Sequence, residues 1–476
     1  MKTHKGIEQL VMKHLNTKGF FSWVVPFPYL LGGLCNILLY YVGLNFQNNI
    51  PRQVFFTGTT SLFFLFSLCW AFWLMKKKGF SWKFMLRLGM VPLLLCICVI
   101  ASLLNNGINM DTVRWAASVL VFSISAFIAG AYSSLYKQEV SFFTVIERWS
   151  VFFLPAALEY TISSFFAQSR FVNSGGLGII NYMSLSYIFL PAMMASTILY
   201  AKDDSGYAGI INGKKGRRIR FCVITLLWAA IVFTGTRGAI LCGVFFLLCL
   251  TIFCLIIKHP VKQAVILCCS SITILILILF VHTQLATQFG VQGQSSRVIA
   301  SITSNTRSYE FDIGRPSDNP PTEAAQDISV VDNTEYSVFR EMDKLINSSA
   351  PVTDEYRYTR LSLYYLALGE IRKNPLTGMG PFGFQVKYRY DPHNFILELL
   401  AELGVFIGGI AILFIALLCL RLVKKAKKDV SMGFFLIFIF GFIPCIMISI
   451  SFWQSPYLMF PIGYALFYGT PNVASS

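Results

Sequence analysis

The residues best placed to do chemistry lie in the stretch DPHNFILELLAELG, residues 391–404. Within it, His393 follows a long polar segment and precedes an apolar run long enough to cross a membrane. His393 is therefore expected at the boundary between water and lipid, where a water-borne group can meet a lipid-borne one. An imidazole at that place can act as a general base near neutral pH. The alternative is a histidine that only caps or anchors the helix at the interface.

The residues around His393 predict how its helix begins. Asp391 is expected as the N-cap and Pro392 at the first helical position, with His393 and Asn394 in the first turn. Helical spacing then puts Asn394, Glu398 and Glu402 on one face. Asn394 and Glu398 are candidates for binding a substrate there. Glu402 would lie roughly 15 Å below the helix start, where a carboxyl group must be paired, protonated or in a polar cavity.

Four arginines are candidates for binding an anion. Arg237 lies in FTGTRGAI between two apolar runs, and a guanidinium group forks well onto phosphate oxygens. Arg357 and Arg360 begin a second candidate helix, and Arg170 lies in the loop QSRFVNSGG. The alternative for Arg237 is a side chain that extends from a helix end to the interface. For Arg357 and Arg360 it is a solvated charged edge, and Arg170 is a weaker candidate of the same type.

These residues must be positioned by membrane helices. Of the 476 residues, 55% are hydrophobic and only 13% are charged, about half the charged fraction of a soluble domain. The apolar runs predict an all-α polytopic membrane protein with about 12 transmembrane helices. The candidate spans are residues 20–44, 54–75, 84–104, 115–136, 149–168, 183–201, 219–235, 238–257, 263–282, 393–420, 432–452 and 455–470.

The basic residues predict the orientation of these spans. If the N-terminus is cytoplasmic, alternation places every basic tract on the cytoplasmic side, as the positive-inside rule requires, and both termini are cytoplasmic. The net charge of +16 therefore reflects membrane topology, and nucleic acid is not expected as a partner. The tracts are Lys76–Lys83, Lys137–Arg148, Lys202–Arg220, Lys258–Lys262 and Arg421–Lys428.

The same alternation divides the chain into three parts. About nine helices occupy 1–282, a long extracytoplasmic loop occupies 283–392, and about three helices occupy 393–476. The loop contains an apolar face at helical spacing, formed by Leu361, Tyr364, Tyr365 and Leu368. This pattern predicts an amphipathic helix, ended by Asn374-Pro375, that can lie along the membrane surface.

Several kinds of site are missing from the sequence. It has no phosphate-binding loop of the GxxxxGK[ST] form, no HExxH motif, and no DxD pair in the long loop. No metal and no cofactor are therefore expected. Cytosolic nucleotide donors cannot reach an external site. Arginines and a histidine there suit a lipid pyrophosphate donor, whose leaving group cations can neutralise.

Three segments, in this order, resemble the O-antigen ligase/O-antigen polymerase family of bacterial envelope glycosyltransferases. FTGTRGAIL (233–241) is similar to the family's Thr/Ser-Arg-Gly turn. TRLSLYYLALGEIRKNPLTGMGPFGF (359–384) resembles its arginine-led helix followed by Asn/His-Pro-Leu-x-Gly-x-Gly. PHNFILELLAELGVFIGG (392–409) is similar to its His-Asn helix ending in a Leu-Gly turn.

The resemblance implies a C-type glycosyltransferase fold and a metal-independent, inverting transfer. The donor would be an oligosaccharide on undecaprenyl pyrophosphate, and the acceptor a hydroxyl group of a glycan or of lipid A–core. Arg237 and Arg360 would neutralise the pyrophosphate, His393 would activate the acceptor or assist the leaving group, and Asn394 and Glu398 would support them. The implied location is the bacterial inner membrane, with the active site on the periplasmic or extracellular face and membrane lipid and other polysaccharide-assembly proteins as partners.

The family contains more than one activity. A polymerase joins lipid-linked repeat units of O-antigen, capsule or exopolysaccharide, and this is the preferred interpretation. A ligase moves the finished chain to lipid A–core, and related enzymes glycosylate proteins. From the residues alone, a lipid-linked glycan flippase or secondary transporter is the alternative class. The long loop and the absence of repeat symmetry count against it.

Overall fold

The chain is helical throughout the part that the structure, a computed structural model, describes. Regular structure outside helices is limited there to one isolated bridge between Tyr207 and Ile211. This agrees with the all-α class that the sequence predicts. The described residues are 24–41, 49–78, 81–108, 110–137, 139–166, 182–202, 206–234, 236–257, 266, 270–271, 273, 276, 346–347, 360–427, 429–448 and 451–469.

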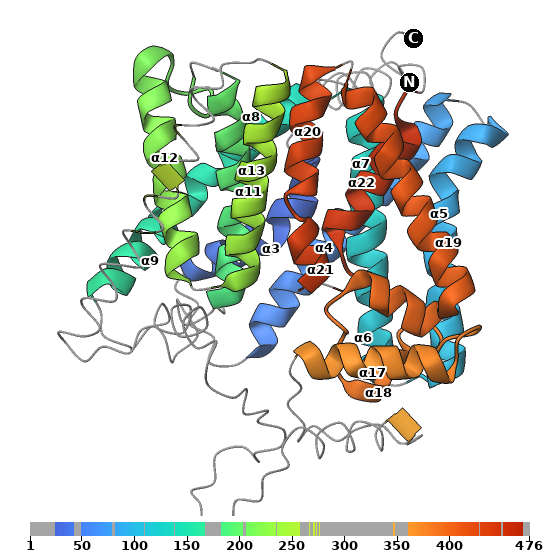
Figure 1. Cartoon of the computed structure of the whole chain (residues 1–476). Helices are drawn as coiled ribbons and strands as arrows, with labels where there is room; N and C mark the ends of the chain where they lie inside the picture. The colour runs from blue at the N-terminus through green and yellow to red at the C-terminus, as the bar shows by residue number, and fades with distance from the viewer. Residues whose placement is uncertain are drawn as a thin grey trace, which may run out of the picture.

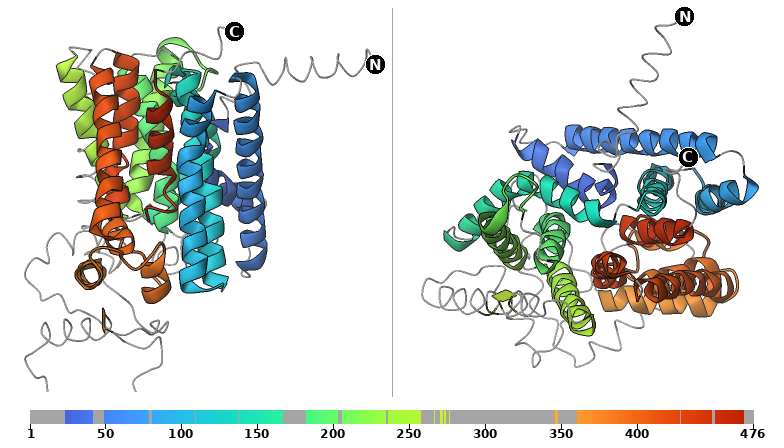
Figure 2. Two further views of the ribbon diagram at one scale, coloured as in Figure 1. Left: turned by 90° about the vertical axis from the view of Figure 1, so that its right-hand side faces the viewer. Right: turned by 90° about the horizontal axis from the view of Figure 1, so that it is seen from above.

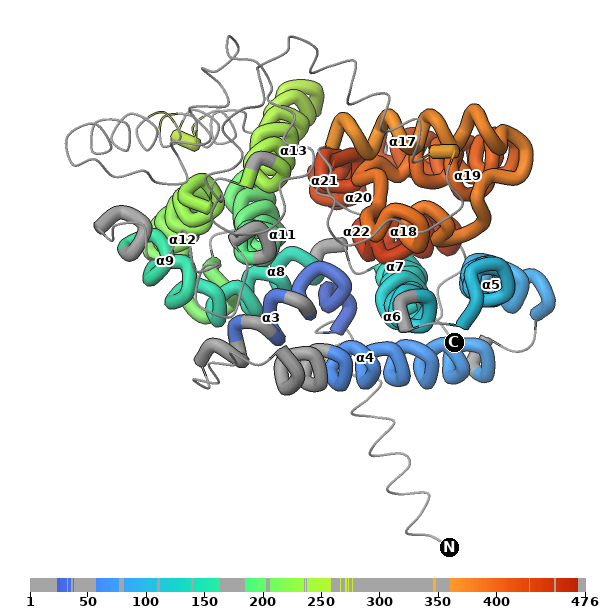
Figure 3. Tube along the Cα trace, turned by 90° about the horizontal axis from the view of Figure 1, so that it is seen from below, coloured from blue at the N-terminus to red at the C-terminus, as the bar shows by residue number. Residues whose placement is uncertain are grey.

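Most helices run side by side as a bundle, and α17 lies across one end of it (Figures 1 and 2). The view along the bundle shows α17 and α18 over that end (Figure 3). The elements are α3 (Phe27–Tyr41), α4 (Asn49–Lys78), α5 (Trp82–Asn106), α6 (Met110–Ser118), the π-helix η1 (Val119–Ile124), α7 (Ser125–Leu135), α8 (Glu139–Ser150), the 3₁₀-helix η2 (Val151–Phe153), α9 (Leu154–Phe166), α11 (Tyr182–Ala201), α12 (Gly213–Phe233), α13 (Arg237–Ile256), α17 (Arg360–Lys373), α18 (Gly383–Tyr388), α19 (Phe395–Ala426), α20 (Val430–Phe440), α21 (Ile443–Ile448) and α22 (Pro456–Phe467).

The described residues contain seven helical segments long and apolar enough to cross a membrane. Two shorter apolar helices occupy Leu185–Ala201 and Pro456–Phe467. The chain is therefore a polytopic membrane protein. The predicted span at 263–282 lies mostly outside the described residues, so the count of twelve stays a prediction, as do the three-part division and most of the loop. The seven segments are Thr57–Lys76, Trp82–Asn106, Thr112–Leu135, Ser141–Ile162, Gly238–Ile256, Phe395–Ala426 and Val430–Ile448.

Small residues let α7 and α22 pack with their backbones in contact. A Cβ on Gly130 would lie 2.0 Å from the carbonyl oxygen of Phe460. A Cβ on Gly463 would lie equally close, 2.0 Å, to the carbonyl oxygen of Phe127. Close approach at small residues drives helix association in membranes, where lipid tails remove the hydrophobic gain. This contact fixes the last described helix in the centre of the bundle.

A buried ion pair joins α8 to α12. Arg220 donates from Nε and Nη2 to both carboxylate oxygens of Glu147, at 2.6 and 3.0 Å, and both side chains are buried. The same carboxylate accepts the backbone N–H of Ala208 at 2.7 Å, and Arg148 donates to the Ala208 carbonyl at 3.0 Å. The loop before α12 is thereby held against the end of α8.

The arginine-led helix exists, and a different stripe of residues from the predicted apolar face packs on the protein. As predicted, α17 covers Arg360–Lys373 and ends before Asn374-Pro375. Its buried face carries Leu363, Leu366, Ala367 and Glu370, whereas Leu361 and Leu368 of the predicted face are 56% and 45% exposed. The predicted apolar face is therefore not the face that packs on the protein, because α17 packs against α19 and Ile346 through the neighbouring stripe of residues, and its placement on the membrane surface stays a prediction.

Candidate functional site

The candidate site is built on a break in α19. Gly404 has φ 74° and ψ 168°, a backbone conformation that is essentially restricted to glycine. In an unbroken helix the Val405 N–H would donate to the Ala401 carbonyl. It donates instead to the Pro375 carbonyl at 2.7 Å. The break therefore leaves backbone groups on both sides of Gly404 that need other partners.

The loop after α17 provides those partners. Met379 donates its N–H to the carbonyl of Ala401 at 2.9 Å, and Gly380 donates to that of Glu402 at 2.8 Å. Gly378 has φ 64°, and a Cβ there would lie 2.4 Å from the Glu402 carbonyl oxygen. Gly378 of the Pro-Leu-x-Gly-x-Gly run is therefore needed for backbone to meet backbone. The arginine-led segment (359–384) and the His-Asn helix segment (392–409) therefore form one structural unit.

The side chain of Glu402 stabilises the same unit through hydrogen bonds. Its carboxylate is fully buried and accepts the backbone N–H of Phe382 at 2.8 Å and that of Phe384 at 3.3 Å. The indole Nε1 of Trp453 donates to it at 2.5 Å. The sequence requires a polar partner for a carboxyl group at this position, and three N–H donors meet that requirement.

Glu398, one turn earlier, joins α19 to the segment before α22. Its side chain is fully buried and accepts from Ser451 Oγ at 2.5 Å, Gln385 Nε2 at 2.5 Å and the Phe452 N–H at 2.6 Å. These contacts occupy both carboxylate oxygens. The predicted role of Glu398 in substrate binding remains a proposal, and its contacts are those of a residue that positions its neighbours.

The start of α19 differs from the prediction. Asn394, and not Asp391, is the N-cap: its side chain accepts the N–H groups of Ile396 and Leu397 at 3.0 and 3.2 Å. His393 has φ 51°, a left-handed conformation incompatible with the first turn of a helix. The helix therefore begins at Phe395, three residues later than an Asp391-Pro392 start would require. His393 precedes the helix on a constrained backbone.

His393 lies beside a carboxylate. Its Nδ1 is 2.6 Å from Oδ1 of Asp391, and the two side chains are 30% and 15% exposed. The angles of this contact do not fit a hydrogen bond, so Nδ1 has no hydrogen-bond partner among the described residues. A partly exposed imidazole next to an acid has the composition of a general base with an orienting group.

The structure places the starts of α13, α17 and α19 at one end of the bundle. Phe253, near the end of α13, packs on Phe434 at the start of α20 with ring centroids 5.2 Å apart, so α13 runs opposite to α20 and α21. Arg237, the first residue of α13, therefore lies at the end where α21 stops. Tyr364 of α17 donates to the Met447 carbonyl of α21 at 3.5 Å, which puts α17 there as well.

The predicted arginines are described to different extents. Arg360 is exposed at the first turn of α17, and no hydrogen bond or ion pair joins it to His393 among the described residues. For Arg237 the structure describes the backbone position only. Arg357 and Arg170 lie outside the described residues.

A second polar cluster supports α17 and was not predicted. Glu370 is 1% exposed and accepts from Lys387 Nζ at 2.7 Å and from Tyr388 Oη at 2.6 Å. Lys387 and Lys373 both donate to the Ile346 carbonyl, at 2.9 and 3.0 Å. The sequence signal for this cluster was Glu370 itself, an acidic residue between apolar positions on the predicted helix. Its partners, 17 and 18 residues away, could not be inferred.

Comparison with known proteins gives one finding. Residues 222–409 match the model of a protein family described as O-antigen ligase. The matched region runs from α12 into α19 and contains Arg237, Arg360 and His393 together with the break at Gly404. No curated protein and no solved structure matches the chain.

Proposed function

We propose that the chain, whose residues 222–409 match the O-antigen ligase family, polymerises the repeat units of a bacterial surface polysaccharide. The donor is a glycan on undecaprenyl pyrophosphate, and the acceptor is a hydroxyl group of a second lipid-linked glycan. The reaction takes place on the extracytoplasmic face of the inner membrane, in a protein of about twelve spans with a C-type glycosyltransferase fold and both termini in the cytoplasm.

The observation that carries the proposal is the pairing of the loop after α17 with the break in α19. Met379 and Gly380 bond to Ala401 and Glu402, so the helix led by Arg360 and the helix preceded by His393 are fixed to each other. Arg237 begins α13 at the same end of the bundle. A catalytic site needs such rigid support, because small displacements of reacting groups greatly lower the rate.

In the proposed reaction His393 is the general base. Asp391 favours the imidazole tautomer with its proton on Nδ1, once a small ring rotation aligns the 2.6 Å contact. Nε2 is then able to take the proton of the acceptor hydroxyl. The acceptor oxygen forms a bond to the anomeric carbon as the bond to the pyrophosphate oxygen breaks, with inversion.

The arginines act on the leaving group. Arg360 and Arg237 neutralise the negative charge that develops on the departing undecaprenyl pyrophosphate. Asn394 and Glu398 hold the start of α19, and Arg357 and Arg170 are proposed to contact the phosphates or the glycan. Among the described residues no group of three or more His, Cys, Asp or Glu side chains is arranged for a metal ion. Metal independence is part of the proposal and rests on the motifs of the sequence.

Glycan size profiling in a deletion strain tests the proposal. Single repeat units on the carrier or on the core are the expected result, with long chains restored by wild type and not by His393→Ala or Arg360→Gln. Arg218→Gln, an exposed arginine on α12 near the opposite end of the bundle, is the matched control and restores long chains. Equal rescue by His393→Ala would contradict the role of His393.

The family description favours one other candidate, the ligase that transfers a finished polysaccharide to lipid A–core. The same experiment separates the two functions. A ligase deletion accumulates full-length chains on undecaprenyl pyrophosphate, because chain growth continues without transfer to the acceptor.

A further inference from the structure

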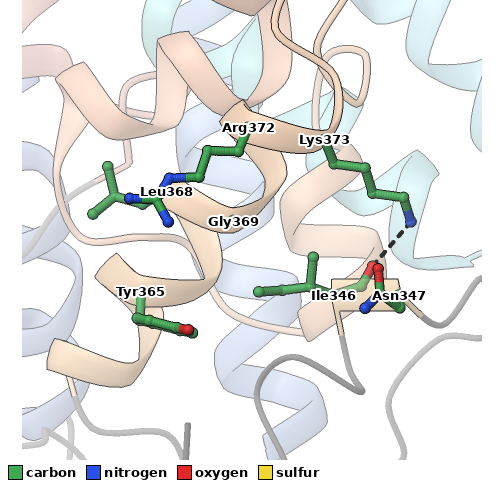
Figure 4. Close-up of a pocket in the computed structure, with 7 residues that line it drawn as sticks. All are labelled: Ile346, Asn347, Tyr365, Leu368, Gly369, Arg372 and Lys373. Atoms are coloured by element: carbon green, nitrogen blue, oxygen red, sulfur yellow. Dashed lines mark hydrogen bonds between the residues drawn. The ribbon is translucent and has the colours of Figure 1, made fainter. Parts of the chain in front are cut away.

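The outer face of α17 carries a cavity that the proposed reaction does not use. The cavity has a volume of about 370 Å³, within the range of small-molecule sites. It lies between α17 and Ile346-Asn347, as Figure 4 shows. Its lining residues are Ile346, Asn347, Tyr365, Leu368, Gly369, Arg372 and Lys373.

The lining combines three kinds of group on one helix face. Tyr365, Leu368, Gly369 and Arg372 follow the spacing i, i+3, i+4, i+7, so they share a face of α17. Tyr365 and Leu368 supply an aromatic and an apolar surface, and Asn347 adds an amide group from across the cavity. An apolar and aromatic wall with a few polar groups is the usual composition of a site for a small organic group.

The far wall of the cavity is held in place by specific contacts. Lys373 and Lys387 both donate to the Ile346 carbonyl, at 3.0 and 2.9 Å. Gly369 permits this approach, since a Cβ there would lie 2.2 Å from Cδ1 of Ile346. Figure 4 shows Lys373 reaching to Ile346, while Arg372 extends to a different side of the helix. The shape of the cavity is therefore fixed by specific contacts between α17 and Ile346.

The described residues that line the cavity include two cations, Arg372 and Lys373, and no acidic side chain. Glu370 is buried and already neutralised by Lys387 at 2.7 Å. Neither Arg372 nor Lys373 forms an ion pair within the described part of the chain, and both side chains are exposed. The Lys373 ammonium group is bonded to the Ile346 carbonyl at 3.0 Å, so the group of the lining that can meet an acidic ligand is the Arg372 guanidinium, which binds carboxylate or phosphate oxygens in a forked geometry. The occupant that fits is an organic ring carrying an acidic group.

We propose that this cavity is a glycan subsite for a sugar residue that carries a carboxylate or phosphate group. The inference rests on the proposed function, because a glycan is expected along α17 only if the protein transfers one. Arg372 is 12 positions after Arg360, about 18 Å along the helix axis. That distance is the length of a short oligosaccharide, so the cavity holds the glycan several residues away from the pyrophosphate.

Ring-matched probes test the subsite. The purified full-length protein in phosphatidylcholine nanodiscs is titrated with methyl glucoside, methyl glucuronide and glucose 6-phosphate, and binding is followed by saturation-transfer NMR. At least one acidic probe is expected to bind tenfold or more tightly than methyl glucoside. Arg372→Gln is expected to remove that preference. Arg372→Lys is expected to reduce it, because lysine keeps the positive charge but lacks the forked pair of N–H donors of the guanidinium group. Lys424→Gln, an exposed cation at the other end of α19, leaves it unchanged.

Four results would overturn the proposal. The first three are equal affinity for the three probes, no binding of any probe, and a preference that survives Arg372→Gln. A fourth is binding of phosphatidylglycerol that depends on Arg372 without any sugar preference, which would make the cavity a lipid headgroup site. The titration requires no glycosyl transfer. Its failure therefore leaves the proposed polymerase standing, whereas a deletion strain that keeps its long chains would overturn the polymerase without changing the titration result.

Discussion

The backbone N–H of Met379 donates to the carbonyl of Ala401 at 2.9 Å. Ala401 would otherwise accept from Val405 within α19, and the break at Gly404 removes that donor. A loop residue thus completes the hydrogen bonding of a membrane helix. Breaks in such helices are tolerated where neighbouring protein satisfies the freed backbone groups. The loop and the helix are therefore expected to respond to mutation as one unit.

Gly404→Ala tests this unit. An alanine at φ 74° and ψ 168° is strained, and its Cβ would lie 2.2 Å from the Leu376 carbonyl oxygen. We expect a loss of about 1 to 3 kcal/mol from the backbone conformation alone, seen as a lower unfolding temperature in detergent. Gly409→Ala, with open space around its Cβ in the same helix, is the control and should not lower that temperature. Equal effects of the two changes would disprove the argument.

Trp453→Phe tests the attachment of Glu402. The change keeps an aromatic ring but removes the indole N–H that donates to Glu402 at 2.5 Å, in a side chain that is 1% exposed. The lost hydrogen bond and the smaller ring together should cost about 2 to 4 kcal/mol of stability. Trp82→Phe, at a tryptophan that is 71% exposed, should be nearly neutral. Thermal unfolding followed by intrinsic fluorescence measures both.

Arg220→Gln tests the buried ion pair. Removing the guanidinium group leaves the Glu147 carboxylate buried without its partner at 2.6 Å. Breaking one side of such a pair costs about 3 to 5 kcal/mol. The expected result is a large fall in unfolding temperature or in the amount of folded protein after purification. Arg218→Gln on the exposed side of α12 provides the reference, and a similar fall there would contradict the assignment.

A chelator tests metal independence. Transfer by the purified protein is expected to continue at its full rate in excess EDTA, because cationic side chains take the place of a divalent ion at the pyrophosphate. The measurement is product formation with and without EDTA. A loss of activity that Mg²⁺ or Mn²⁺ restores would refute this part of the proposal.

The sequence predicts the class of fold and the position of most helices, because apolar runs of membrane length are typical of transmembrane helices and rare in soluble domains. It does not identify the cap of α19. Asp391-Pro392 and Asn394 are both good start signals, and the choice depends on the left-handed backbone at His393. A local pattern cannot reveal that conformation.

The sequence also leaves the buried face of α17 undecided. Leu361 and Leu368 form one apolar stripe, and Leu363 and Leu366 form another beside it. Packing against α19 and Ile346 selects the second stripe. For the candidate site the limit is similar, since the partners of Glu398 and Glu402 include Ser451 and Trp453, more than 50 positions away. Contacts of that separation have no local signature.

The pair formed by Glu147 and Arg220 also bears on how the protein is assembled in the bilayer. The two residues are 73 positions apart, and α11 lies between their helices in the chain. A buried charge that lacks its partner costs about 3 to 5 kcal/mol. During synthesis Glu147 leaves the ribosome first, and its helix lacks the matching cation until α12 follows. We therefore expect α8 to reach its final packing only once α12 has been made, so that this half of the protein folds cooperatively across the helices from α8 to α12.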